Sequence, residues 1–201
     1  YVHVRDPGFP GIQEVINNAA ATGAPLHIVH INSMALGHIE SALFDEGWQS
    51  DLGGIGYGDL QWQDTGERLN PSSFEAYRAQ GGVVIIHRMK AAWIDAGIGR
   101  HSIMTASDGM PYAPGAHPRS AGTFARVLGR YVRERQALDL MNAVAKMTLM
   151  PGDRLSMIAP GARLKGRVQV GADADITVFD PDRVVDRATF SSGLQFSEGI
   201  E

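Results

Sequence analysis

Length, composition and charge limit what this chain can be. It has 201 residues, of which 44% are hydrophobic, and this is enough for one or two domains with a buried core. The formal net charge of −4 and the lack of a basic run exclude a typical nucleic-acid binder. No apolar stretch of about 18 residues and no signal-peptide pattern occurs, so we expect no membrane span and a cytoplasmic protein. The absence of cysteine excludes disulfides and thiolate metal sites within these residues.

The N-terminal part alternates between strand and helix patterns. Tyr1–Arg5 is rich in β-forming residues and predicts a strand. Ile12–Ala21 has apolar residues at a helical period and is followed by a Gly-Ala-Pro stop. Leu26–Ile31 predicts the next strand, and Ala35–Leu43 a short helix. This order predicts βαβ units and a parallel sheet, and therefore an α/β fold.

The middle of the chain contains a long segment without periodicity. Residues 44–70 are rich in Gly, Trp and Asp, and a loop of this length usually forms a lid or a binding loop. Asn70-Pro71 then predicts a capped helix start. Val83–Ile86 predicts a third strand, which ends in His87, and a brief helix follows over Ala91–Ala96.

The stretch from His101 to Arg119 is the most informative part of the chain. A short apolar run, Ile103–Ala106, leads into Ser-Asp-Gly and predicts a buried strand over His101–Asp108. Loops that follow the carboxyl ends of parallel strands converge on one face, so Asp108 has the position of a catalytic carboxylate. The alternative is that Asp108 only caps the turn before Gly109.

The C-terminal part changes from helical patterns to a Gly-punctuated tail. We expect a boundary near residue 158, with a small β segment after it. The predicted helices are Thr123–Arg135, Leu138–Met147 and Met150–Met157, and the predicted extended segments are Ala174–Phe179 and Pro181–Phe190.

Three residues at predicted strand ends carry donor groups suited to zinc. They are His3, His30 and Asp108, and catalytic zinc takes nitrogen and oxygen ligands from different elements. His27 lies on the opposite face of the strand from His30, which favours His30, while His87 is the main rival. A lone strand histidine can equally be an ordinary core or edge residue.

Arg119 follows the proline-rich turn after Asp108. Its guanidinium could bind a substrate carboxylate with two parallel hydrogen bonds, or it could simply be solvated. The sequence pattern by itself favours a solvated arginine.

Several motifs together resemble one family. They are Ser107-Asp108-Gly109-Met110-Pro111, Ala116-His117-Pro118-Arg119, the helix Gly122–Arg133, His3-Val4-Arg5-Asp6, Ile28-Val29-His30 and the tail Gly171–Asp182. Nearly the whole chain resembles the D-aminoacylase (N-acyl-D-amino-acid deacylase) branch of the amidohydrolase superfamily. Gly58–Trp62 is similar to members that act on D-glutamate derivatives.

The resemblance implies a fold, a cofactor and roles for four residues. It implies the C-terminal strands of a (β/α)8 TIM-type barrel over 1–157, with a lid-like insertion at about 44–87, and a β-sandwich segment over 158–201. His3, His30 and Asp108 would bind one or two Zn²⁺ ions, and Arg119 would hold the carboxylate of the substrate.

The implied reaction is hydrolysis of a small-molecule N-acyl (D-)amino acid, with Asp108 as the proton-transferring residue. One alternative on the same barrel is a cyclic-amide hydrolase of the dihydroorotase or hydantoinase kind. An alternative of another class is a catalytically inactive barrel that serves as a scaffold or binding module. No oligomeric state follows from these motifs.

The chain also departs from the family pattern. A barrel needs roughly 250 residues, and the family's first-strand His-x-His pair and fourth-strand ligand would precede Tyr1, so we expect a piece of a longer polypeptide. A helix and a strand that the family usually carries are missing between Glu40 and Ser41, and omission fits better than loss, because losing a strand would break barrel closure. Asn32 stands where a lysine is usual.

Overall fold

The computed structural model describes residues 2, 9–28, 57–87, 91–109 and 115–201. Its backbone contacts divide the chain into two units, which we describe separately. The first comprises residues 1–56 and 88–97, and the second comprises residues 57–87 and 98–201. The second unit contains most of the described residues and both Asp108 and Arg119.

The first unit contains the helix predicted near the N-terminus. Helix α1 (Phe9–Thr22) packs around Ile12, which is buried against Val2, Val15 and Ile28. Val2 and Ile28 form a parallel bridge across this helix, as the predicted βαβ order requires. The helix ends where Gly23 adopts a φ of 66°, a value that glycine tolerates without strain. The predicted helix Ala35–Leu43 lies outside the described residues.

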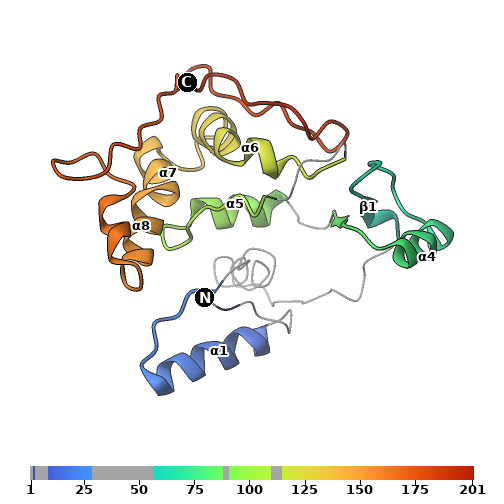
Figure 1. Cartoon of the computed structure of the whole chain (residues 1–201), viewed down its shortest axis with the longest axis horizontal. Coiled ribbons are helices and arrows are strands. Elements are labelled where there is room, and N and C mark those ends of the chain that lie inside the picture. The colour runs from blue at the N-terminus through green and yellow to red at the C-terminus, as the bar shows by residue number, and fades with distance from the viewer. Residues whose placement is uncertain (1, 3–8, 29–56, 88–90, 110–114) are drawn as a thin grey trace. The chain divides into compact units, whose positions relative to one another are not determined.

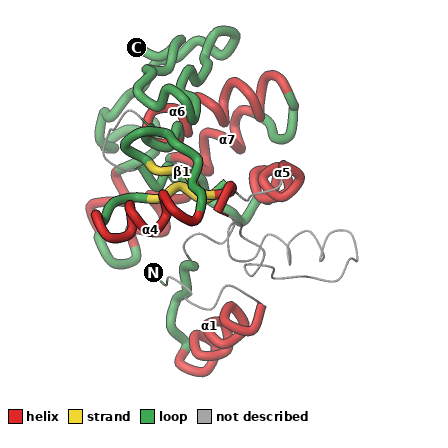
Figure 2. The backbone as a smooth tube through the Cα atoms, turned by 90° about the vertical axis from the view of Figure 1, so that its right-hand side faces the viewer, coloured by secondary structure: helices red, strands yellow, loops and turns green. Residues whose placement is uncertain are grey.

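In the second unit, residues 57–87 contain a short antiparallel sheet. A 3₁₀ turn, η2 (Tyr57–Asp59), precedes β1 (Leu60–Trp62), which pairs with β2 (Val84–Ile86) in the register Leu60 to Ile86. Figure 2 shows these two strands as the yellow segments beside α4. The strand predicted over Val83–Ile86 is therefore confirmed, and its partner is antiparallel. Its apolar run predicts a strand but does not specify the partner.

Helix α4 (Pro71–Gln80) begins as the sequence predicts. The side chain of Asn70 accepts hydrogen bonds from the backbone N–H groups of Ser72 and Ser73, each at 3.0 Å. The hydroxyl of Ser73 accepts in return from the N–H of Asn70 at 3.0 Å. These bonds satisfy N–H groups that the first helical turn leaves unpaired, so the local sequence is sufficient to fix where α4 starts.

Four consecutive helical segments form the main body of the second unit. Helix α6 (Arg119–Arg126) continues without a break into a π-helical segment, η3 (Val127–Glu134), whose last bond runs from the N–H of Arg135 to the carbonyl of Arg130. Helices α7 (Leu140–Met147) and α8 (Leu149–Ser156) follow and contact each other, as Figure 1 shows. All three predicted helices of this region are confirmed. Helix α5 (Ala91–Gly99) is also confirmed and runs three residues longer than predicted.

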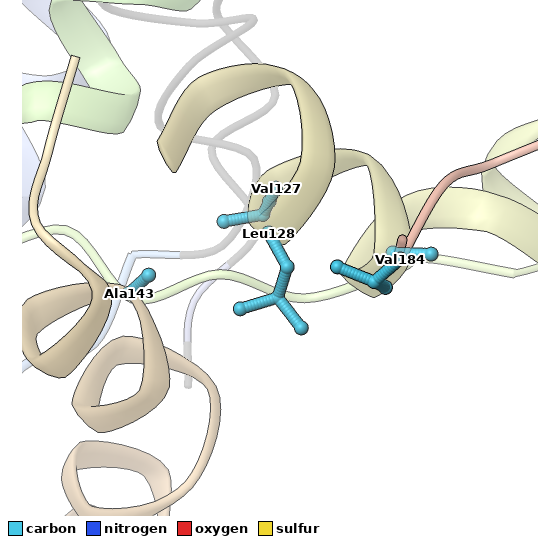
Figure 3. Packing of buried hydrophobic residues seen from close by; sticks show 5 residues of the cluster. Val127, Leu128, Ala143 and Val184 are labelled. Carbon is cyan, nitrogen blue, oxygen red and sulfur yellow. The ribbon is translucent and has the colours of Figure 1, made fainter. Parts of the chain in front are cut away.

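The core of the second unit lies between η3, α7 and the tail. Val127, Leu128, Ala143 and Val184 are buried and meet there, together with Ala125 (Figure 3). The tail can approach the helix because two glycines face it. A Cβ on Gly122 would lie 2.8 Å from Cβ of Asp186, and one on Gly129 would lie 2.5 Å from the carbonyl oxygen of Val184. Arg126 fixes this contact through an ion pair of 2.8 Å with Asp186.

A buried lysine connects α7 to the end of α5. Lys146 is only 2% exposed, and its ammonium group donates to the carbonyl oxygens of Ile98 and Arg100, the latter at 2.6 Å. The carbonyls at the end of a helix lack partners within the helix, so this side chain satisfies groups that burial would otherwise leave unpaired. Burial lowers the pKa of Lys146.

The tail after residue 158 is less regular than predicted. It contains one 3₁₀ segment, η4 (Pro160–Leu164), and isolated bridges such as Phe179 to Ile200 and Val185 to Glu198. The strand predicted over Ala174–Phe179 does not form: Ile176 is 61% exposed, and Phe179 makes an isolated bridge to Ile200. A strand needs both a pairing edge and a covered face to be stable.

The strand predicted over His101–Asp108 is not formed either. Its residues follow an irregular path, in which the N–H of Thr105 donates to the carbonyl of Lys146 at 3.1 Å. Across the described ranges, β1 and β2 make the only sheet, so the fold is α/β and no barrel is visible in it. No helix among these residues has the length and apolar character needed to cross a bilayer.

Candidate functional site

Two of the four predicted site residues lie in contact. Nη2 of Arg119 is 2.8 Å from Oδ2 of Asp108. Both side chains remain partly accessible, with 36% of Arg119 and 48% of Asp108 exposed. The pair joins the end of the segment that leads into Asp108 to the first residue of α6, eleven positions later in the sequence. The fold therefore brings these two residues of the predicted site into direct contact.

The local structure around Asp108 bears on the alternative that it only caps a turn. Asp108 has a φ of 49°, in the left-handed region that Asp tolerates better than most residues. The N–H of Gly109 donates to the hydroxyl of Ser107 at 3.3 Å, so Ser107 supplies a side-chain bond that closes the turn. Oδ2 of Asp108 forms an ion pair with Arg119. Asp108 therefore has a charged partner outside its own turn.

The guanidinium of Arg119 has unused hydrogen-bonding capacity. Its Nε atom is buried and has no hydrogen-bond partner within the part of the chain that the structure describes. A buried N–H without an acceptor is costly, and a guanidinium presents its donors as a fork that matches a carboxylate. Among the described residues, the Nε–H group of Arg119 thus lacks an acceptor that an anion could supply.

His117 holds the backbone next to this arginine. Its Nδ1 accepts a hydrogen bond of 3.1 Å from the N–H of Arg119. The ring of His117 packs edge-on against Phe190, with ring centroids 4.8 Å apart. Burial lowers the pKa of His117 to about 4, and the nearby positive charge of Arg119 contributes. The ring is therefore neutral near pH 7, which is the form that can accept a hydrogen bond.

A second histidine lies on the same phenylalanine. The ring of His87 is 4.2 Å from that of Phe190, and its Nε2 is 2.8 Å from Oε1 of Gln61. The amide of Gln61, which is 2% exposed, also donates to the carbonyl of Phe190 at 3.0 Å. We call Gln61, His87, His117 and Phe190 the Phe190 junction. His87, the rival candidate for a metal ligand, thus packs against Phe190.

Sequence analysis did not single out three members of this junction as functional. Gln61 and His117 lie inside motifs that carry the family resemblance, and these motifs could have indicated that the two residues are functional. Phe190 stands at the end of a predicted extended segment, and nothing in its local pattern indicates that it packs between two imidazoles. Such a contact joins residues more than 70 positions apart and has no local signature.

Three backbones meet next to the junction, and each contributes a glycine. A Cβ on Gly115 would collide with the carbonyl of Gln63 and would lie 2.6 Å from the backbone nitrogen of Gly66. A Cβ on Gly193 would collide with the carbonyl of Ala116. The insertion, the turn before α6 and the tail are thus packed together at positions where a side chain has no room.

Two of the three predicted metal ligands, His3 and His30, lie outside the described residues. The carbonyl of His27, on the strand predicted to carry His30, accepts a hydrogen bond from the N–H of Val2. Within the described ranges there is no cluster of three or more His, Cys, Asp or Glu that could hold a metal ion. Asp108 supplies an accessible carboxylate, and with two imidazoles it would complete the nitrogen and oxygen donor set that zinc prefers.

Comparison with known proteins gives relatives with known names. No family model matches the chain. N-acyl-D-glutamate deacylase of Alcaligenes xylosoxydans xylosoxydans is 51% identical over 98 residues, which are 49% of this chain and 19% of that protein. The crystal structure of a D-aminoacylase that defines a subset of amidohydrolases has a TM-score of 0.74 at 24% identity, and the match covers 98% of this chain and 49% of that one.

A second solved structure is informative about metal and inhibitor. N-acyl-D-glutamate deacylase from Bordetella bronchiseptica was crystallised with zinc and a phosphonate inhibitor that mimics the tetrahedral intermediate of the reaction. It has a TM-score of 0.70 at 26% identity, and the match covers 99% of this chain and 50% of that one. The chain therefore spans about half the length of the solved relatives it matches. It is related to N-acyl-D-glutamate deacylase in sequence, and to this enzyme and D-aminoacylase in fold.

Proposed function

We propose that the protein containing this chain is a zinc-dependent amidohydrolase that cleaves N-acyl-D-amino acids into a carboxylate and a free D-amino acid. The observation that carries this proposal is the contact between Asp108 and Arg119. A substrate with both an amide and a carboxylate would need a proton-transferring group and a cation, and the carboxylate of Asp108 lies beside a guanidinium whose buried Nε has no acceptor among the described residues. The names of the relatives support the same substrate class.

Arg119 binds the carboxylate of the substrate in this proposal. Its guanidinium lies at the start of α6, where the positive end of the helix dipole also favours a negative charge. Fixing the carboxylate would orient the amide bond relative to Asp108. Asp108 would accept a proton from the attacking water and deliver it to the departing amine.

His3, His30 and Asp108 would hold the zinc, with the remaining ligands in residues that precede Tyr1. The bound ion would polarise the amide carbonyl and lower the pKa of the attacking water. The oxygen of Asp108 and two imidazole nitrogens match the donors of catalytic zinc sites. We also propose that residues 1–157 contribute to a (β/α)8 barrel with an insertion at about 44–87, that residues 158–201 form the β-sandwich segment, and that the protein acts in the cytoplasm.

The proposal is tested with the full-length protein loaded with zinc. We expect release of amino acid from N-acetyl-D-glutamate and related N-acetyl-D-amino acids, and at least about tenfold lower kcat/KM for the L enantiomers. Hydantoin and dihydroorotate are assayed in parallel. Turnover of these cyclic amides without turnover of the linear ones would assign the chain to a cyclic-amide hydrolase instead.

Metal content separates the enzyme from an inactive scaffold. We expect at least one zinc per chain after purification in metal-free buffer, and loss of activity with a chelator that zinc restores. A full-length protein that retains no metal and cleaves none of these substrates would contradict the proposed function.

A further inference from the structure

One contact in the second unit joins a side chain to the backbone of the residue proposed to bind substrate. His117 Nδ1 accepts from the N–H of Arg119 two residues later, a local bond of the kind that Asn and Asp side chains often make. Pro118, between them, makes no side-chain capping bond. Within the described residues, His117 is thus the side chain that fixes the backbone direction at the first residue of α6.

That backbone direction matters because Arg119 has competing demands. Its Nη2 is paired with Asp108 at 2.8 Å, while its buried Nε points where no described residue accepts a bond. A shift of the Cα of Arg119 would move both nitrogens together, since the guanidinium is a rigid plane. The position of the backbone therefore decides whether the fork can serve Asp108 and a second anion at once.

The Phe190 junction in turn fixes the ring of His117. Phe190 is in contact with both imidazoles, and Gln61 ties His87 to the carbonyl of Phe190. The packing against Phe190 restricts the plane of the His117 ring, and the hydrogen bond from the N–H of Arg119 selects the orientation that presents Nδ1. The near-complete burial of Gln61 makes this support rigid.

We propose that His117 is a positioning residue that sets the substrate-binding geometry of Arg119, and that the Phe190 junction links this geometry to the insertion. This inference rests on the proposed role of Arg119 in binding a substrate carboxylate. It assigns no contact with substrate to His117. Its effect is expected on recognition of the carboxylate and not on the chemical step.

Two variants separate the hydrogen bond from the ring. His117→Asn keeps an acceptor that can reach the N–H two residues later and loses the ring, whereas His117→Phe keeps the ring and loses the acceptor. Measured on the zinc-loaded full-length protein, His117→Phe is expected to raise KM for N-acetyl-D-amino acids about tenfold with kcat changed less than about threefold, the size of one lost oriented hydrogen bond. His117→Asn is expected to stay within about threefold of wild type.

A substrate without a carboxylate provides the decisive contrast. For the corresponding N-acetyl amine, His117→Phe is expected to leave kcat/KM within about twofold, because there is no carboxylate for Arg119 to hold. His101→Phe and His101→Asn, at an exposed turn, serve as matched controls. Equal losses with both substrates, or equal losses in the Asn and Phe variants, would overturn the positioning role.

A second readout does not depend on activity. Hydrogen exchange of the peptide that covers residues 117–122 is expected to accelerate in His117→Phe and to remain near wild type in His117→Asn. If wild type shows no deacylase activity, the proposed function fails, whatever this exchange shows. If wild type is active but neither the exchange nor KM distinguishes the two variants, the inference about His117 fails and the proposed function stands.

Discussion

Asp108 and Arg119 form an ion pair whose nearest atoms are 2.8 Å apart, and each of these residues has a different proposed partner in the complete site. The pairing holds the carboxylate and the guanidinium at a fixed separation before substrate arrives. Because both side chains are more than one third exposed, the pair contributes little to folding stability. Its expected effect is to hold the two groups in position for the proposed reaction.

Replacement of Asp108 by Asn tests proton transfer. The amide keeps the shape and an oxygen but cannot accept a proton, so we expect kcat to fall about 100-fold or more. Zinc content should remain largely intact, as metal analysis of the purified variant would reveal. Asp182→Asn, at an exposed position of the tail, is the control. A variant that kept full turnover would remove Asp108 from the mechanism.

Replacement of Arg119 by Ala tests carboxylate binding. A charge-assisted hydrogen bond contributes about 1.5–3 kcal/mol, so KM for N-acyl amino acids should rise about 10- to 100-fold. Arg119→Lys should recover only part of this, because an ammonium group lacks the planar fork. Arg130→Ala, an exposed change on η3, should leave KM unchanged. An unaltered KM in Arg119→Ala would assign this arginine to the surface.

The lowered pKa of His117 predicts a pH effect on stability. Its pKa is about 4 in the folded protein, below the ordinary value of 6.5, so the unfolded chain binds more protons between these values. The contribution of His117 is therefore fully present above pH 6.5 and is lost as pH falls toward about 4. Burial is the main cause, Arg119 and His87 add to it, and Asp108 opposes it.

The measurement is urea unfolding of wild type and His117→Asn at several pH values between 7 and 4. The free energy of unfolding should fall more steeply for wild type, since Asn does not titrate. Parallel curves for the two proteins would show that His117 is not buried in its neutral form.

The contact between Gly129 and the tail predicts a packing penalty. A methyl group at Gly129 would lie 2.5 Å from the carbonyl oxygen of Val184, which cannot move aside as a flexible side chain could. Gly129→Ala should therefore lower the free energy of unfolding by about 1–3 kcal/mol. Gly161→Ala is a suitable control, because a Cβ there meets nothing within 4 Å. Denaturant midpoints that are equal in the two variants would contradict the close approach.

The buried ammonium group of Lys146 predicts a large effect of its removal. Lys146→Met retains most of the volume but leaves the carbonyls of Ile98 and Arg100 without their donor, so stability should fall by about 1–3 kcal/mol. Lys165→Met removes an exposed lysine from surface ion pairs and should lower stability much less than Lys146→Met. Thermal or urea unfolding of the two variants gives the comparison.

Helices were predictable from the sequence because their signals are local. The cap at Asn70, the periodicity of α1 and the helical run after Arg119 each specify an element without reference to distant residues. Strand partners were not predictable, as Val83–Ile86 demonstrates: its apolar run is correct for a strand, but its antiparallel partner lies more than 20 residues earlier. Pairing depends on non-local contacts that no local pattern encodes.

The site was predictable to a similar extent. Asp108 and Arg119 are near in sequence and were identified together, and the structure pairs them. The Phe190 junction depends on three segments folding onto one another, so only the structure reveals it. Whether His3 and His30 join Asp108 at a metal stays a prediction.

The close packing of Gly66, Gly115 and Gly193 has a consequence for chimeric proteins. An insertion transplanted from a relative with different substrate preference would meet a loop and a tail shaped to another backbone. Exchanges that carry all three segments together should give folded hybrids, whereas crossover points that separate position 66 from positions 115 and 193 should give poorly expressed ones.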